Sequence, residues 1–211
     1  YSASPVEEIA EVSRVTFRNK VEIRFKPAGS SPGFWYPYAA TTYSNTFTVE
    51  PGADVTIYVE RNSVYPGLYD GPNVNLAVGA GGSLVIHTYD TLHRDAITDD
   101  FSSVTIQENG TLEVMQSANT NTTATMRISG SLNVSPGARF VVRNASGSTY
   151  GALHMTSSGA SINVANPALF DVMNNGGYAI NTTASTSLSV DADVVNLWNA
   201  NAPDPDTGDI S

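Results

Sequence analysis

The chain of 211 residues is long enough for one or two domains, and its charged share of 14% lies well below the roughly 25% of an ordinary soluble domain. A net charge of −10 argues against nucleic acid or an anionic membrane as the main partner, because both attract clustered Lys and Arg. Cysteine is absent, which excludes disulfides and thiolate metal sites, and no apolar run approaches the about 18 residues of a membrane span.

The first 44 residues predict an N-terminal cap made of a short helix and strands. Ser4 is a suitable helix N-cap, Pro5 fits the first helical position, and the helical pattern continues to Ala10. Apolar and polar residues then alternate over 15–17 and 21–25, as they do in strands with one buried face. We assign residues 1–44 to this cap.

From Phe47 onward, a fixed unit recurs: a short alternating strand, a turn containing glycine, and a second short strand. Five turn glycines that we take as equivalent lie 30, 28, 20 and 29 residues apart, namely Gly52, Gly82, Gly110, Gly130 and Gly159. Periods of about 20–50 residues indicate solenoids, propellers or arrays, in which stacked units share one apolar column. Residues 45–200 are therefore predicted to form a parallel β-solenoid in an all-β protein.

An antiparallel β-sandwich is the alternative fold, because it too combines short strands with frequent turns. Asn109-Gly110 and Asn175-Gly176 would then be its hairpin turns. The recurring strand-glycine-strand unit favours the solenoid.

Three segments resemble a known family: 105–114 (TIQENGTLEV), 128–138 (ISGSLNVSPGA) and 163–175 (NVANPALFDVMNN). They are similar to the pectate-lyase-like β-helix domains of cell-wall-anchored surface proteins of Gram-positive bacteria, and residues 162–199 look like the last coils of such domains. The resemblance implies a right-handed parallel β-helix outside the bacterial cell with an adhesive or ligand-binding role. It does not imply lyase activity, because the family's name refers to its fold.

Catalytic patterns are weak in this sequence. Lyase chemistry of the pectate type needs a cation, usually calcium, held by several carboxylates beside a basic side chain. Asp95, Asp99 and Asp100 form the densest acidic cluster, which we interpret as a solvated loop and therefore as weak candidates for a metal site. The three histidines share no metal-ligand spacing, and no nucleophile or phosphate-loop motif is present. We predict a non-enzyme without a cofactor, leaving calcium open.

Candidate ligand-binding residues lie in the N-terminal half. Aromatic side chains stack on sugars and anchor protein partners, and the candidates of this kind are Trp35, Tyr36, Tyr38, Tyr65 and Tyr69. Covering the end of the solenoid is the alternative role of Trp35. Four basic residues could share one solvent face that meets an anionic glycan, or could protect an edge strand by charge: Arg18, Lys20, Arg24 and Lys26.

We therefore expect a non-catalytic adhesin module that binds a host or microbial glycan or protein. A polysaccharide lyase or hydrolase on the same scaffold and a passive structural stalk are the alternatives. The Pro- and Asp-rich residues 201–211 read as a linker, and the chain begins without Met, so we expect a monomeric domain of a longer protein. That protein would be extracellular and anchored to a bacterial cell wall.

Overall fold

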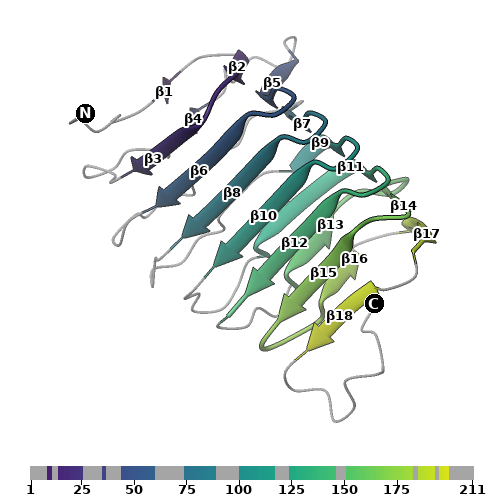
Figure 1. Cartoon of the computed structure of the whole chain (residues 1–211). Helices are drawn as coiled ribbons and strands as arrows, with labels where there is room; N and C mark the ends of the chain where they lie inside the picture. The colour runs from purple at the N-terminus through teal and green to yellow at the C-terminus, as the bar shows by residue number, and fades with distance from the viewer. Residues whose placement is uncertain are drawn as a thin grey trace.

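The computed structural model describes residues 9–10, 14–25, 35–36, 44–59, 74–88, 100–116, 124–145, 151–182, 185–192 and 195–199. Throughout these residues the secondary structure consists of β-strands, stacked side by side from the N-terminal to the C-terminal end (Figure 1). No helix in this part of the chain is long and apolar enough to cross a membrane.

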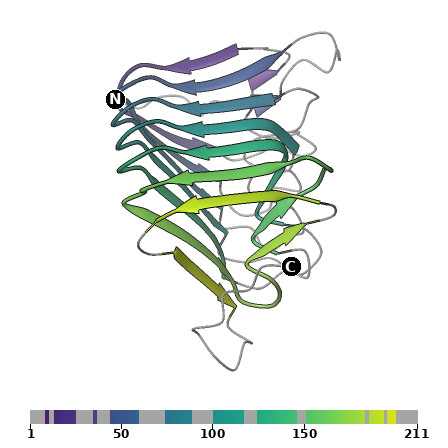
Figure 2. The same ribbon diagram turned by 90° about the vertical axis from the view of Figure 1, so that its right-hand side faces the viewer.

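Two large sheets form the sides of the molecule, and the chain passes back and forth between them (Figure 2). The seven-stranded sheet consists of β3 (Val21–Phe25), β6 (Asp54–Val59), β8 (Ser83–Thr88), β10 (Thr111–Gln116), β12 (Arg139–Asn144), β15 (Leu169–Asn174) and β18 (Val195–Asn199). The nine-stranded sheet consists of β2 (Arg14–Phe17), β5 (Asn45–Val49), β7 (Val74–Val78), β9 (Asp100–Ile106), β11 (Met126–Val134), β13 (Leu153–Met155), β14 (Ser161–Ala165), β16 (Ile180–Thr182) and β17 (Ser187–Asp191). A separate pair joins β1 (Ile9–Ala10) to β4 (Trp35–Tyr36).

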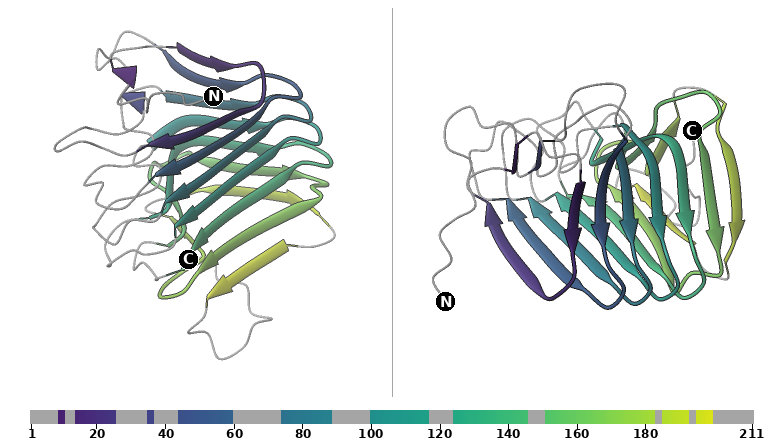
Figure 3. Two further views of the ribbon diagram at one scale, coloured as in Figure 1. Left: turned by 60° about the vertical axis from the view of Figure 1, so that its left-hand side comes forward. Right: turned by 90° about the horizontal axis from the view of Figure 1, so that it is seen from above.

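Every strand pairing within the two large sheets is parallel, and the colours in Figure 3 follow the stack in unbroken order from purple to yellow. Each inner coil of the stack thus pairs with the coil before it and the coil after it. The predicted all-β parallel solenoid is confirmed, and the parallel pairing rules out the antiparallel sandwich.

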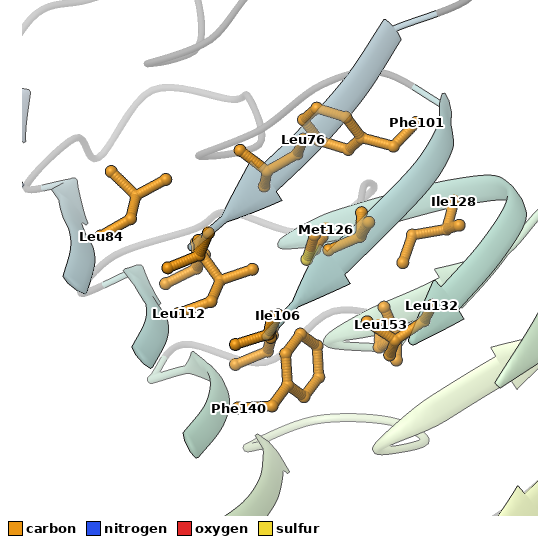
Figure 4. Close-up of a cluster of buried hydrophobic side chains, with 14 of the residues drawn as sticks. Leu76, Leu84, Phe101, Ile106, Leu112, Met126, Ile128, Leu132, Phe140 and Leu153 are labelled. Carbon is orange, nitrogen blue, oxygen red and sulfur yellow. The ribbon is translucent and has the colours of Figure 1, made fainter. Parts of the chain in front are cut away.

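The core is a set of columns in which equivalent inward residues of successive coils stack. In the seven-stranded sheet, Leu84 pairs with Leu112 and Leu112 with Phe140, and all three are fully buried. Side chains from both sheets project into the same interior (Figure 4), and they belong to one contiguous cluster. Burial of one such Leu or Phe side chain stabilises the fold by about 1.5–3 kcal/mol. The alternating sequence pattern exists because every second residue must enter this interior.

Four turns that lead from the nine-stranded to the seven-stranded sheet share one backbone feature. Their third residue has a positive φ: Gly52 at 71°, Gly81 at 62°, Asn109 at 57° and Gly137 at 69°. Type II turns require such a residue at this place, where glycine is favoured and asparagine tolerated. The N–H of the fourth residue closes the turn, as Ala53 does on the carbonyl of Glu50 at 3.0 Å.

These turns correct the glycine repeat inferred from the sequence. The residues at the equivalent positive-φ place lie 29, 28 and 28 residues apart. Gly82 and Gly110 occupy the next place in their turns, where the first unit has Ala53, and each donates its N–H across the turn. Gly130 lies inside β11 and Gly159 precedes β14, at a different corner. The 20-residue spacing was wrong because it compared two different corners.

Gly130 marks a bend that changes the shape of the coil. The pairing of β11 with β9 shifts register between Ile128 and Ser131. A Cβ at Gly130 would lie 1.9 Å from the carbonyl oxygen of Ser102, so no larger residue fits there without movement. In the next coil the two halves of β11 are covered by two separate strands, β13 and β14. The solenoid therefore gains a corner partway along its length.

The stacked coils begin earlier than residue 45, where we placed the boundary between cap and solenoid. β2 pairs in register with β5, and β3 pairs in register with β6, so residues 14–25 form a full coil. The alternation at Val15 and Ile23 supplies the same inward columns as later coils. Ile9 and Ala10 are strand residues rather than the end of a helix. The rest of the expected helix and the linker at 201–211 lie outside the described residues.

Candidate functional site

One column of side chains runs along the outer face of the seven-stranded sheet. Its members occupy the same outward position in seven successive strands, and their pairing follows strand register. We call this column the outer stripe: Arg24, Tyr58, His87, Met115, Arg143, Met173 and Trp198. Adjacent strands of a sheet lie about 4.8 Å apart, so neighbouring members of the stripe are close enough to touch.

The first three members of the outer stripe stack on one another. The guanidinium carbon of Arg24 lies 5.0 Å from the centroid of the Tyr58 ring. The Tyr58 and His87 rings follow, with centroids 5.4 Å apart and an angle of 21° between their planes. Cation–π and ring-stacking contacts of this kind hold side chains in place. These side chains are therefore ordered before any ligand arrives.

His87 sits in an environment that favours its neutral form. Partial burial lowers the pKa of the His87 imidazole because it removes water from the charged form, while the carboxylate of Glu113 raises it and opposes this effect. Burial is the larger of the two causes. At neutral pH the imidazole of His87 is thus a hydrogen-bonding group without charge.

An ion pair occupies the C-terminal half of the outer stripe. Nε of Arg143 donates to Oδ2 of Asp171 at 3.2 Å, and Nη2 of the same arginine donates to the same oxygen. Asp171 is buried, with 7% of its surface exposed. The Arg143 side chain is 45% exposed, so the pair is half-buried, and its two hydrogen bonds to one carboxylate oxygen fix where the guanidinium lies.

Two carboxylates share an outward column beside the stripe. Glu113 pairs with Val141, and Val141 pairs with Asp171, so the two acids are two strands apart, or about 9–10 Å at the backbone. Inverting glycosidases also use two carboxylates, with about 6.5–9.5 Å between their carboxyl groups. However, Asp171 already accepts two hydrogen bonds from Arg143, so it is poorly placed to protonate a glycosidic oxygen.

Three of the four basic candidates lie among the described residues, and each contacts an acid. Nε of Arg18 lies 3.0 Å from Glu50, and Nζ of Lys20 lies 3.1 Å from Asp54. Nε of Arg24 lies 3.1 Å from Glu22. Arg18 and Lys20 lie in the turn before β3, whereas Arg24 lies within β3. Lys26 is outside the described residues.

Most of the other candidates fall outside the described part of the chain. Trp35 and Tyr36 form β4, but only their backbone is described. Tyr38, Tyr65, Tyr69, Asp95 and Asp99 lie outside the described residues. Asp100 begins β9, and its side chain is also outside them. Among the residues that the structure describes, no three His, Asp or Glu side chains come together as a metal site would require.

The outer face of the nine-stranded sheet differs from the stripe. From β5 onward its outward positions carry mostly Ser, Thr and Asn, and these side chains bond to one another across coils. Ser103 Oγ donates to Asn75 Oδ1 at 2.6 Å, and Asn163 Nδ2 donates to Asn133 Oδ1 at 3.0 Å. This face therefore uses its polar groups to join coils.

Of the outer stripe, sequence reasoning identified only Arg24. The signal was present, because each stripe member directly follows an inward apolar residue of its strand. Finding it requires the strands to be aligned by register. The glycines taken as equivalent in the sequence belong to two different corners of the coil, so they did not give that register.

Comparison with known proteins found no match to this chain among protein-family models, curated proteins or solved structures.

Proposed function

We propose that this chain is a non-catalytic binding module of a bacterial cell-surface protein, and that it binds a partner protein along the outer stripe. The observation that carries the proposal is the composition of the stripe, which reads Arg, Tyr, His, Met, Arg, Met and Trp in seven successive strands. Tyr, Trp, Met and Arg are the residue types enriched in protein interfaces, whereas Ser and Ala are depleted there. The outer face of the nine-stranded sheet has the opposite composition.

The order of these side chains supports binding as well. Stacking of Arg24, Tyr58 and His87 and the pairing of Arg143 with Asp171 restrict their rotamers in the free protein. Immobilising a rotamer-rich side chain costs about 0.5–1.5 kcal/mol on binding, and an ordered surface avoids part of that cost.

The charge pattern argues against a strongly anionic ligand. Arg18, Lys20, Arg24 and Arg143 each contact an acid, so the positive charges of these side chains are largely compensated. An adhesive role on the outside of a bacterium also agrees with the low charge content and with the resemblance to surface-protein domains.

The proposal is tested with a panel of purified host and bacterial surface proteins, together with a glycan array. A partner from the protein panel is then titrated against the double variant Tyr58→Ala/Met115→Ala and against the control Thr48→Ala/Thr105→Ala, whose changes lie on the other sheet. We expect the stripe variant to bind at least about tenfold more weakly, because truncation of an interface anchor typically costs more than 1 kcal/mol, and the control to bind as wild type.

Equal binding by both variants would place the interface elsewhere and contradict the proposal. Binding to the glycan array alone would identify a carbohydrate ligand instead. Calcium-dependent release of unsaturated products from uronate polymers would make the protein a lyase. If no tested protein or glycan binds, the passive structural stalk becomes the favoured function.

A further inference from the structure

The chain contains four methionines, and strand register divides them into two pairs. Met126 and Met155 are inward residues of the core and are fully buried, and Met126 can be followed in Figure 4. Met115 and Met173 are outward members of the outer stripe and are partly exposed. An oxidant must reach the sulfur atom, so the methionines of the stripe are the reactive pair.

The two stripe methionines lie on either side of one arginine. Met115 pairs in register with Arg143, and Arg143 pairs in register with Met173. Adjacent strands are about 4.8 Å apart, so the two methionines are about 9–10 Å apart at the backbone. His87 follows Met115 on one side, and Trp198 follows Met173 on the other. A partner that lies over Arg143 therefore meets both thioethers at once.

Oxidation changes what these two positions offer to a partner. A methionine side chain is apolar and flexible and fits irregular apolar surfaces, whereas its sulfoxide is polar and accepts hydrogen bonds. The guanidinium of Arg143 carries more N–H donors than the two that Asp171 accepts, so it can donate to a sulfoxide oxygen on either side. The apolar surface that flanks Arg143 would thus become a polar, hydrated one.

We infer that Met115 and Met173 form a reversible oxidation switch, in which peroxides convert them to sulfoxides and weaken partner binding at the outer stripe. This inference rests on the proposed function, since it assigns a regulation to the same surface. In the reaction the sulfur attacks one oxygen of hydrogen peroxide. The O–O bond breaks, an S–O bond forms, and the second oxygen takes the remaining proton and leaves as water. The sulfur is oxidised and the peroxide reduced by the same electron pair, and methionine sulfoxide reductases reverse the change.

The first test follows the oxidation itself and needs no partner. The full chain is treated with hydrogen peroxide, digested at intervals and analysed by mass spectrometry, which records the oxygen gained by each methionine. We expect Met115 and Met173 to be oxidised at least about tenfold faster than Met126 and Met155, because only the first pair is accessible to the oxidant. Equal rates for all four methionines would overturn the inference.

The second test measures binding of the outer-stripe partner before and after peroxide treatment. We expect oxidised wild type to bind at least about tenfold more weakly, and methionine sulfoxide reductase to restore its affinity. The variant Met115→Leu/Met173→Leu has no thioether in the stripe, so its own affinity should not change on treatment. The control Met126→Leu/Met155→Leu keeps the stripe and should lose affinity on treatment as wild type does.

Far-UV circular dichroism at each time point limits the comparison to protein that keeps its β-structure. Oxidised wild type that binds as tightly as untreated protein overturns the inference, as does a stripe variant that loses affinity on treatment. Failure of the proposed function is a different result, because it appears in untreated protein as equal binding by the variants Tyr58→Ala/Met115→Ala and Thr48→Ala/Thr105→Ala.

Discussion

The two ends of the solenoid differ in how far their inward apolar residues are exposed. Among the described residues, each end has a coil whose strands are paired on one side only, and each has apolar residues in the inward columns. At the first coil, Val15 and Ile23 are buried, Phe17 and Val21 are partly buried, and ion pairs such as Lys20–Asp54 lie at the surface. At the last coil, Leu188 and Val195 are exposed and β18 carries no charge. The repeat therefore builds the interior in the same way everywhere, while each end needs its own cover.

This comparison implies that stability varies along the stack. In a solenoid each coil interacts mainly with its neighbours, so total stability is roughly a sum of coil and interface contributions. In the part of the chain that the structure describes, a central coil pairs with two neighbours and the last coil with one. Substitutions of the same kind should therefore cost most in the centre and least at the ends.

The largest effect is expected for Phe140→Ala. Phe140 is fully buried and stacks on Phe170 with ring centroids 5.2 Å apart. Truncation of a buried Phe removes its burial and leaves a cavity, which together cost about 3–5 kcal/mol. Urea unfolding followed by circular dichroism measures the loss in the free energy of unfolding. A loss below about 1 kcal/mol would mean that the centre is no more stable than the ends.

The next effect is expected for Gly130→Ala. The added Cβ would lie 1.9 Å from the carbonyl oxygen of Ser102, so the backbone of β9 or β11 must move. Overpacking of this kind typically costs about 1–3 kcal/mol. The control is Gly52→Ala, where no atom lies within 4 Å of the new Cβ and only the positive φ opposes the change. Equal thermal melting of Gly130→Ala and wild type would contradict the close approach.

A smaller effect is expected for Leu188→Ala in the last coil. Leu188 occupies the same kind of inward position as Ile162 but keeps 43% of its surface exposed. Removing a partly exposed side chain loses less burial and leaves no closed cavity, so we expect less than about 1.5 kcal/mol. The matched change Ile162→Ala should cost about 2–5 kcal/mol in the same urea titration. If both cost the same, the last coil is covered in solution.

The smallest effect is expected for Lys20→Ala at the first coil. Lys20 pairs with Asp54 at 3.1 Å, but its side chain is 85% exposed. Exposed ion pairs contribute about 0–1 kcal/mol and are screened by salt. The difference from wild type should therefore shrink further as sodium chloride is added during thermal unfolding. A large effect that salt does not change would show that this end depends on the ion pair.

The alternation of apolar and polar residues predicted the fold better than the spacing of glycines did. The alternation around Leu84, Leu112 and Phe140 was sufficient to predict strands, inward faces and a solenoid, because burial in a strand has a period of two. The same alternation at Val15 and Ile23 was misassigned to a cap, because the residues between this coil and the next hid the repeat. Spacing alone also could not show that Gly130 belongs to a different corner from Gly52.

The candidate site was harder to predict. Arg24 was singled out for its charge, whereas its stack with Tyr58 and His87 depends on strand register across coils that are far apart in sequence. Arg143 and Asp171 are 28 residues apart, and only the pairing of β12 with β15 brings them together.

The sequence by itself determined that this chain stacks short strands around an apolar interior, because alternation and glycine turns are local properties that each unit repeats. Tertiary structure alone decided which coil begins the stack, which outward residues align into one stripe, and which inward residues remain uncovered. Those outcomes depend on register between coils and on whether a neighbour exists, and neither is encoded within a single unit.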